Sequence, residues 1–360
     1  MINLKKLGLT ALAGSLVAVS AQAGEMSVTG SANVTYKTGN GGEFGNAGKT
    51  IGSDRDVSFT GSGEMDNGWT FKVSTTLDDA YEVSSSYTTM TMGSLGTLTT
   101  GTDTGGASYK YDEEVPQAYE QTSDAQQNSA NVVGNQMDSN SIVYNSPSFE
   151  FEGATVSFDA EFSPNANGLG SGDGGTTAKV TAGNNFGKGY GLGVTAKYMG
   201  LTAGVYGSER ENRALATGAT GVNDAFEGVW YAKYSYGPVS VGYSESYLDS
   251  GLNTADVAAT TAKTSNRANS GIFSSESMSV AFNVNENLSL SYTSTEDTYD
   301  DQDHIAATVA DVIQESKALQ VAYSMGAMSV KAYNIETKNP SYDSDASTEN
   351  VTEIALGLAF

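Results

Sequence analysis

The amino-acid sequence predicts an all-β protein, a closed antiparallel β-barrel of 16 strands that crosses a membrane. Three observations lead to this prediction. Apolar and polar residues alternate along most of the chain, and the connections between the alternating segments are short and long in turn. The last segment, TEIALGLAF, ends on an aromatic residue, and every second residue before it is large and apolar.

The alternating segments are the predicted strands. In residues 27–38, SVTGSANVTYKT, the side chains of Val28, Val34 and Tyr36 fall on one face, whereas Asn33 falls on the other. Alternation with a period of two is typical of a strand whose two faces meet different surroundings. The 16 predicted strands are 27–38, 54–64, 69–78, 83–92, 97–102, 141–149, 154–164, 190–199, 201–210, 225–236, 239–248, 272–284, 288–298, 314–325, 328–338 and 350–360.

The connections between these segments vary in length in a regular way. Long polar connections, such as 39–53 and 249–271, alternate with tight ones, which are DNG at 66–68, SLG at 94–96, Met199-Gly200, Gly237-Pro238, NEN at 285–287 and Gly326-Ala327. An up-and-down sheet with hairpin turns at one rim and long loops at the other produces this pattern. Residues 165–189 are ambiguous, because TTAKVTAGNNF has strand character. We assign this stretch to a loop, since a strand there would break the alternation.

The apolar face distinguishes a membrane barrel from a soluble sandwich, in which that face would pack against a second sheet. Here it carries aromatic residues near strand ends, such as Trp230, Tyr234 and Tyr243, while the other face is mostly serine, threonine, asparagine and glycine. Lipid outside and water inside account for this arrangement. The sheet must then close, because each unpaired backbone group in hydrocarbon costs several kcal/mol. A closed barrel of 16 strands is wide enough to enclose an aqueous channel.

The amino terminus and the composition narrow the possible functions. Residues 1–23 have the basic start, apolar stretch and Ala21-Gln22-Ala23 sequence of a signal peptide, which leaves 24–360 as the mature domain. The apolar run is too short for a membrane anchor. With 18 Lys and Arg against 42 Asp and Glu, the net charge is -24, so we expect no nucleic-acid partner. The lack of cysteine excludes disulfides and thiolate metal sites.

Taken together, these features resemble a general diffusion porin of the Gram-negative outer membrane, of the alphaproteobacterial type. The resemblance spans essentially the whole mature chain, through the first strand MSVTGSANVTYKT, the DNGWTF hairpin and the final IALGLAF. It implies a homotrimer of barrels with short periplasmic turns, long extracellular loops and a third loop folded into each lumen. It also implies contact with outer-membrane lipid and lipopolysaccharide, and passive diffusion of ions and small hydrophilic solutes without catalysis or a cofactor.

The resemblance also gives the last strand a role. Alternating apolar residues that end on an aromatic residue are, in such porins, the signal that the barrel-assembly machinery reads. A strand of this kind can pair with an exposed edge, while its alternate side chains carry the specificity. The residues of this expected signal are Ile354, Leu356, Leu358 and Phe360.

The resemblance places the channel constriction in the longest connection, 103–140, which is rich in carboxylates and holds one cation, Lys110. A connection of this length is usually functional or disordered. Strand parity places basic residues on the polar face, because a lysine on the lipid side would cost ~2–4 kcal/mol near the midplane. Asp159 and Glu161 on the seventh strand should add negative charge to the lumen. The acidic loop candidates are Asp103, Asp112, Glu113, Glu114, Glu120 and Asp124, and the basic wall candidates are Lys37, Lys72, Lys197, Lys233, Lys331 and Arg210.

An acidic loop facing a basic wall would set a transverse field across a narrow gap, and charged rings of this kind set ion selectivity. With the acidic excess, we expect weak to moderate cation preference. A substrate-specific channel is the alternative, and it would need a ladder of lumen aromatics, for which Tyr206, Tyr231 and Tyr333 have suitable parity. A secreted β-rich adhesin is less favoured, because the chain has no fixed repeat of about 20–50 residues.

Two further sites were considered. An enzyme would have to use His304, the only histidine, which lies in a loop among carboxylates, and we expect no catalysis. Clustered carboxylates at 297–303 and 343–347 offer the oxygen ligands that calcium prefers, although no glycine follows at the turn position of a hand-type loop. The calcium candidates are Asp300, Asp301, Asp303, Asp343 and Asp345.

Overall fold

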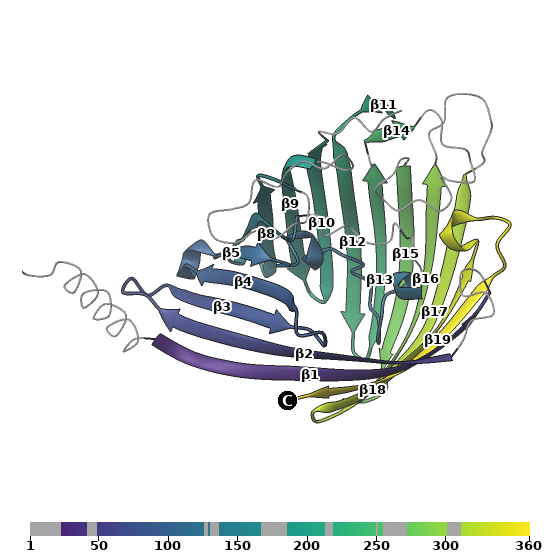
Figure 1. Cartoon of the computed structure of the whole chain (residues 1–360), viewed down its shortest axis with the longest axis horizontal. Helices are drawn as coiled ribbons and strands as arrows, with labels where there is room; N and C mark the ends of the chain where they lie inside the picture. Colours follow the sequence, from purple (N-terminus) through teal and green to yellow (C-terminus); the bar gives the residue numbers. More distant parts are fainter. Residues whose placement is uncertain are drawn as a thin grey trace, which may run out of the picture.

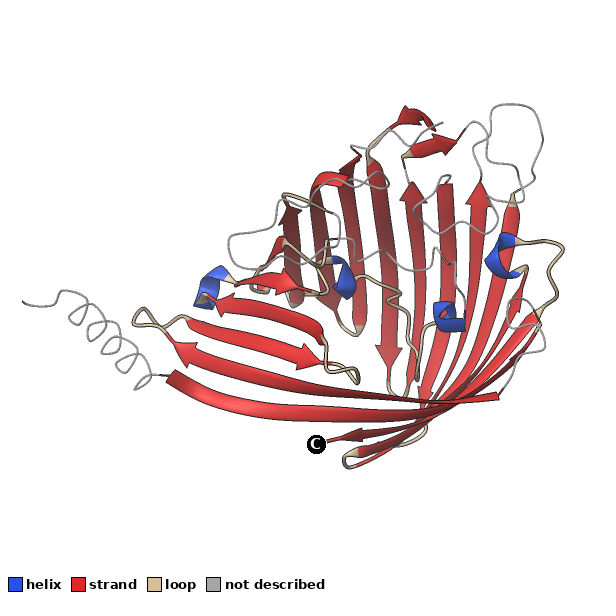
Figure 2. Cartoon of the chain, viewed as in Figure 1, coloured by secondary structure: helices blue, strands red, loops and turns tan. Residues whose placement is uncertain are grey.

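The computed structural model describes residues 23–41, 49–125, 129, 137–166, 186–212, 219–249, 251–254, 272–300 and 311–360. Its main feature is one antiparallel sheet that curls and closes on itself (Figures 1 and 2). The first strand, β1 (Ala23–Asn40), pairs on one side with β2 (Lys49–Glu64) and on the other with the last strand, β19 (Glu349–Ala359). The expected 16-stranded barrel is therefore confirmed.

All the predicted strands are present, and one of them is divided. The segment 141–149 forms β6 (Ser141–Asn145) and β7 (Phe149–Phe151), which both pair with β8 and share one strand position. The other strands of the barrel are β3 (Thr70–Leu77), β4 (Val83–Thr91), β5 (Thr97–Thr102), β8 (Ala154–Ser163), β9 (Phe186–Tyr198), β10 (Leu201–Asn212), β12 (Ala225–Tyr236), β13 (Val239–Asp249), β15 (Ile272–Asn283), β16 (Leu288–Asp300), β17 (Val312–Met325) and β18 (Met328–Lys338).

The connections contain short elements that the sequence analysis did not predict. β11 (Ala219–Val222) and β14 (Leu252–Thr254) form a separate two-stranded sheet above the barrel rim (Figure 1). Of the ambiguous stretch 165–189, residues 167–185 lie outside the described residues, and its last residues begin β9. Four short 3₁₀ helices are also described: η2 (Gly93–Leu95), η3 (Ser108–Lys110), η4 (Thr122–Ala125) and η5 (Pro340–Tyr342).

Tight turns close one rim of the barrel. Between β9 and β10, Met199 and Gly200 both have positive φ angles, 45° and 87°. Two central residues with positive φ are typical of the hairpin turn whose twist matches that of the flanking strands. Gly237 and Gly326, in the turns after β12 and β17, also have positive φ. The predicted hairpin positions are therefore confirmed at these three turns.

Side chains alternate between the two sides of the wall. On one side, large apolar residues such as Leu192, Val205 and Leu319 are exposed. On the other, Ser277 and Thr295 are buried and hydrogen-bond each other across β15 and β16 at 3.0 Å. Exposed apolar surface of this extent marks contact with a membrane or a partner, so the apolar side faces lipid and the polar side encloses the lumen. No helix in the described part of the chain is long and apolar enough to cross a membrane.

Candidate functional site

The segment 103–140, here called the inner loop, folds into the lumen. The structure describes it except for 126–128 and 130–136. Its Ala118 N–H donates to Ser291 Oγ at 2.9 Å, and its Ser129 hydroxyl donates to Asp297 Oδ2 at 2.6 Å. Both acceptors are buried side chains on the polar face of β16, so the loop crosses the interior of the barrel. Figure 2 shows its short helices in blue against the sheet.

Two carboxylates of β8 hold the start of the inner loop. Asp159 accepts hydrogen bonds from Lys110 Nζ at 2.7 Å and from the Tyr111 hydroxyl at 2.8 Å. Glu161 accepts one from the Ala107 N–H at 2.8 Å and another from the Tyr206 hydroxyl. Both carboxylates are buried. The expectation that they add open negative charge to the lumen is therefore wrong, because the inner loop and Tyr206 of β10 enclose both carboxylates.

Tyrosines pack tightly at this first attachment. The Tyr111 ring stacks on Tyr206 with centroids 5.3 Å apart and lies 6.3 Å from Tyr231. The wall makes room for it at Gly193, where an added Cβ would lie 2.4 Å from Tyr111 Cζ and Oη. Glycine in a strand interior often marks such a close approach. Tyr206 and Tyr231 are 2% and 3% exposed, so they lie beneath the loop and do not present rings to passing solutes.

The middle of the inner loop crosses β12, β13 and β15. Glu114 forms an ion pair with Lys233 of β12, and both side chains are partly exposed. The Pro116 carbonyl accepts a hydrogen bond from the Ser279 hydroxyl. A Cβ on Gly242 would lie 2.4 Å from Pro116 Cδ, which shows how closely the loop approaches the wall.

Tyr119 and Glu120 of the inner loop reach β17 and β19. The Tyr119 N–H donates to Gln320 Oε1 at 2.8 Å, and Gln320 Nε2 donates back to the Glu120 carbonyl. The Tyr119 hydroxyl donates to Glu353 Oε1 at 2.8 Å. Glu353 also accepts from the Tyr333 hydroxyl at 3.3 Å and lies 3.8 Å from Lys37 Nζ. These contacts at β17 and β19 add to those that attach the loop to β8, β12, β15 and β16.

The acidic loop candidates have different surroundings. Glu113 is 4% exposed and accepts hydrogen bonds from Thr122 N–H at 3.0 Å and from the Ser123 hydroxyl at 3.2 Å. Burial raises the pKa of Glu113 to about 8. Its carboxyl therefore stabilises the fold of the loop and does not face the lumen water. Burial, together with the adjacent carboxyl of Asp124, raises the pKa of Glu120 to about 8.

The two remaining acidic candidates lie nearer the start of the loop. Asp112 Oδ2 accepts a hydrogen bond from Gln121 Nε2 at 3.4 Å. Asp103 is exposed at the base, where its N–H donates to Ser139 Oγ at 2.9 Å. Burial, and then the neighbouring Asp103 carboxyl, raises the pKa of Asp138 to about 6.

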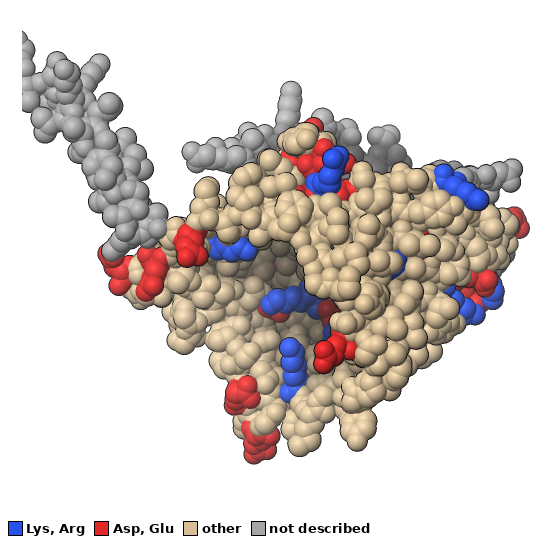
Figure 3. All heavy atoms as spheres, turned by 90° about the horizontal axis from the view of Figure 1, so that it is seen from below, with Lys and Arg blue, Asp and Glu red and all other residues tan. Residues whose placement is uncertain are grey.

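The basic wall candidates fall into two groups. Lys233 forms an ion pair with Glu114 of the inner loop, and Lys331 lies 5.0 Å from the centroid of the Tyr119 ring. Lys37 lies 3.8 Å from Glu353, the carboxylate that also accepts from Tyr119. The other three lie elsewhere on the wall. Lys72 of β3 lies 5.9 Å from the Tyr87 ring centroid, Lys197 is exposed near the turn at 199–200, and Arg210 is buried, 3.8 Å from Glu227 and over the Phe186 ring. Figure 3 shows basic and acidic side chains along a hollow that opens toward the viewer.

Several predicted positions fall beyond the structure. Asp301, Asp303 and His304 lie outside the described residues, and the Asp300 side chain is not described. Asp343 Oδ1 accepts a hydrogen bond from the Asp345 N–H at 3.0 Å. Within the described ranges, no group of three or more His, Asp or Glu side chains is placed to hold a metal ion. Calcium binding remains a prediction.

The last strand presents the expected apolar face. Ile354, Leu356 and Leu358 are all exposed on the lipid side. Phe360 closes the barrel through its backbone: its N–H donates to the Gly30 carbonyl at 2.9 Å, and its carbonyl accepts from the Gly30 N–H at 2.7 Å. Its ring is 76% exposed. The role of these four residues as an assembly signal remains a prediction.

Comparisons with known proteins agree with this geometry. A family model described as Gram-negative porin matches residues 8–360. None of the curated proteins matches the chain. Among solved structures, OmpF of Salmonella typhi in complex with daunomycin is similar at 12% identity and a TM-score of 0.68, with 94% of this chain and 99% of that chain covered.

Two further solved structures are also similar to this chain. The anion-selective porin from Comamonas acidovorans has 12% identity and a TM-score of 0.63, with 93% and 99% of the chains covered. A loop L8 deletion mutant of OmpT, an outer membrane protein of Vibrio cholerae, has 15% identity and a TM-score of 0.61, with 93% and 99% covered. At these identities the similarity establishes the barrel fold alone.

Proposed function

The chain belongs to the Gram-negative porin family and is an outer-membrane channel for passive diffusion, and we propose that it prefers cations weakly to moderately. Its expected solutes are ions and small hydrophilic molecules. The observation that supports a selective constriction is the attachment of the inner loop to β8, β12 and β19, which brings acidic and basic side chains into one lumen. Porin membership indicates a channel and not an enzyme.

A cation preference is expected because the inner loop carries seven carboxyl groups and one basic residue, Lys110. The preference is weak, because Glu114 is neutralised by Lys233 and Glu113 is buried. Salt should reduce it further, since the Debye length falls from about 10 Å at 0.1 M to about 3 Å at 1 M.

A reversal-potential measurement tests this proposal. The purified protein would be inserted into a planar lipid bilayer under a tenfold KCl gradient, at low and at high mean salt. We expect a potential of the sign that indicates potassium preference, larger at low salt. A potential that indicates chloride preference at both salt concentrations would overturn the proposal.

We also propose that the protein forms a homotrimer that contacts lipopolysaccharide and is inserted by the barrel-assembly machinery. Family membership supports the trimer, since trimers are expected of porins of this type. Electrophoresis in mild detergent, with and without heating, tests it: a band that shifts to one third of its mass on heating is expected. The alphaproteobacterial subtype remains a prediction.

The substrate-specific alternative has less support. The three tyrosines whose parity suggested a lumen ladder, Tyr206, Tyr231 and Tyr333, are all buried at the contacts between the inner loop and the wall. A passing solute therefore does not meet their rings.

A further inference from the structure

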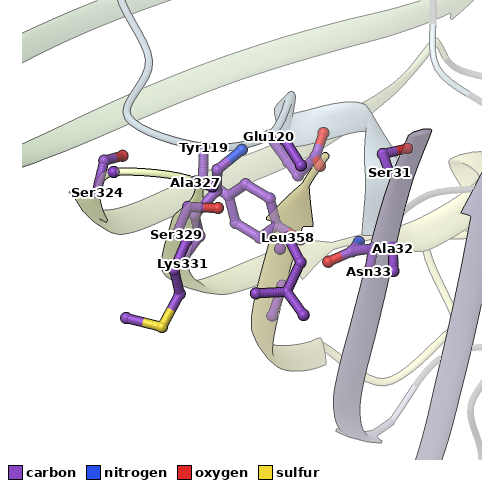
Figure 4. A pocket seen from close by; sticks show the side chains of 15 residues that line it. Ser31, Ala32, Asn33, Tyr119, Glu120, Ser324, Ala327, Ser329, Lys331 and Leu358 are labelled. Atoms are coloured by element: carbon purple, nitrogen blue, oxygen red, sulfur yellow. The ribbon is translucent and has the colours of Figure 1, made fainter. Parts of the chain in front are cut away.

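A cavity of about 320 Å³ lies between the end of the inner loop and the wall formed by β1, β18 and β19. Tyr119 and Glu120 of the loop line one side, and Asn33, Ser329 and Lys331 line the wall (Figure 4). Its size is at the lower end of the range for small-molecule sites, about 300–1,000 Å³.

The wall of the cavity carries one cation. Lys331 Nζ lies 5.0 Å from the centroid of the Tyr119 ring. Within the described residues, Lys331 forms no ion pair, in contrast to Lys37 and Lys233, which have Glu353 and Glu114 as partners. An ammonium group held over an aromatic ring keeps its hydrogen-bond donors available for a bound anion.

The loop side carries the opposite charge. The Glu120 carboxyl lies beside that of Asp124, and its field also reaches Lys331 and Glu353. Burial and the adjacent Asp124 carboxyl raise the pKa of Glu120 to about 8, so the Glu120 carboxyl is negatively charged above that pH. Glu353 already accepts two hydroxyls, from Tyr119 and Tyr333. Above this pH the cavity thus has the Lys331 ammonium group on its wall side and the Glu120 carboxylate on its loop side.

The aromatic wall between these groups is fixed. Tyr119 is held at its backbone by Gln320 and at its hydroxyl by Glu353, each at 2.8 Å. Its ring also packs on Tyr333, with centroids 5.7 Å apart. Side chains locked in this way lose little freedom when a ligand binds, which favours affinity.

We propose that this cavity is a binding subsite for small zwitterions, solutes that carry a carboxylate and an ammonium group a few bonds apart, as α-amino acids do. The solute carboxylate contacts Lys331, and its ammonium group contacts the Glu120 carboxylate, with Asn33 and Ser329 as further polar partners. This inference rests on the proposed function and deepens it. It adds a saturable site to a channel that otherwise conducts without binding.

Single-channel recording in a planar bilayer at pH 9, above the Glu120 pKa of about 8, and at low KCl tests the subsite. L-alanine is the probe, and L-lactamide, which has similar size and no charge, is the control solute. We expect L-alanine to lower the conductance of the wild-type channel in a saturable manner. L-lactamide should cause only a linear decrease.

Variants assign the effect to this cavity. Lys331→Met should raise the half-saturating concentration of L-alanine at least tenfold, and Lys331→Arg should restore most of the binding. Lys72→Met is the matched control, because it removes the same charge from β3, where Lys72 does not line the cavity. Glu120→Gln should weaken L-alanine binding while leaving binding of propionate, which lacks the ammonium group, less affected.

Specific results would overturn the inference. They are a linear response of the wild-type channel to L-alanine, or an equal loss of binding in the Lys331→Met and Lys72→Met variants. A protein that conducts KCl and fails these tests refutes the subsite only. A protein that forms no conducting channel refutes the proposed function itself.

Discussion

The hydroxyl of Tyr111 offers a sharp test of how the inner loop is held in the lumen. It donates to Asp159 Oδ2 at 2.8 Å, while the ring is buried against Tyr206. Tyr111→Phe removes this hydrogen bond and keeps the stacked ring. The variant therefore isolates one polar contact of the attachment at β8.

The magnitude follows from the charge on the acceptor. A hydrogen bond to an ionised group contributes about 1.5–3 kcal/mol, and the Asp159 carboxylate is buried, so water replaces the lost donor poorly. Since each ~1.4 kcal/mol changes an equilibrium tenfold, the attachment should open about 10- to 150-fold more often. The remaining contacts at Lys233 and Glu353 keep the loop in the lumen.

Hydrogen exchange measures this opening. The Ala107 amide, bonded to Glu161 at 2.8 Å, lies in the peptide that should exchange faster in the Tyr111→Phe variant. Tyr109→Phe is the matched control, because the Tyr109 side chain, two residues away, is 73% exposed and makes no hydrogen bond among the described residues. Equal exchange in the two variants and the wild type would refute the reasoning.

Three further predictions concern the same wall and loop. Glu113→Gln replaces a carboxyl whose pKa is raised from 4.5 to about 8 in the folded protein. Between these two pH values the folded protein retains a proton that the unfolded chain releases, so the stability of the wild type should fall as pH rises. Thermal unfolding in detergent should therefore depend less on pH in the variant than in the wild type. Equal slopes would contradict this. Lys233→Met leaves Glu114 without its ion-pair partner, so it should shift the reversal potential toward cation preference more than Lys197→Met does. Equal shifts in the two variants would count against a role of the Glu114–Lys233 pair in selectivity. Phe360→Ala removes an exposed ring and keeps both backbone hydrogen bonds to Gly30. The free energy of unfolding of the refolded barrel should therefore change by less than ~1 kcal/mol. The amount of protein assembled in cells should fall several-fold. An equal effect on refolding and on assembly would make Phe360 an ordinary structural residue.

Strand parity predicted the barrel wall well, because each strand repeats the same two surroundings along its length. Lys37, Lys233 and Lys331 lie on the lumen side as expected, since a lipid-facing lysine would be costly. The inner loop has no such period. Adjacent Glu113 and Glu114 therefore look alike in the sequence, although one is buried within the loop and the other pairs with the wall.

The attachment at β8 was missed for a different reason. Parity placed Asp159 and Glu161 on the polar face, but their partners, Ala107 to Tyr111, lie about 50 residues earlier in the chain. One signal in the sequence points to it. In GKGYGLGV, residues 187–194, glycine occupies every second position, on the face opposite Tyr190 and Leu192. A strand face without side chains indicates that another segment approaches it closely, and at Gly193 that segment is Tyr111.

The inner loop carries less open charge than its sequence suggests, and this limits the selectivity of the channel. Glu113 is buried, Glu114 is paired with Lys233, and burial raises the pKa of Glu120 to about 8. The field in the lumen is therefore a small difference between a few remaining charges on the loop and the wall. A small difference is easily reversed by one or two substitutions, and the similar fold of an anion-selective porin fits this reasoning. The sign of selectivity thus depends on individual pairs such as Glu114 and Lys233, and far less on the net charge of the chain.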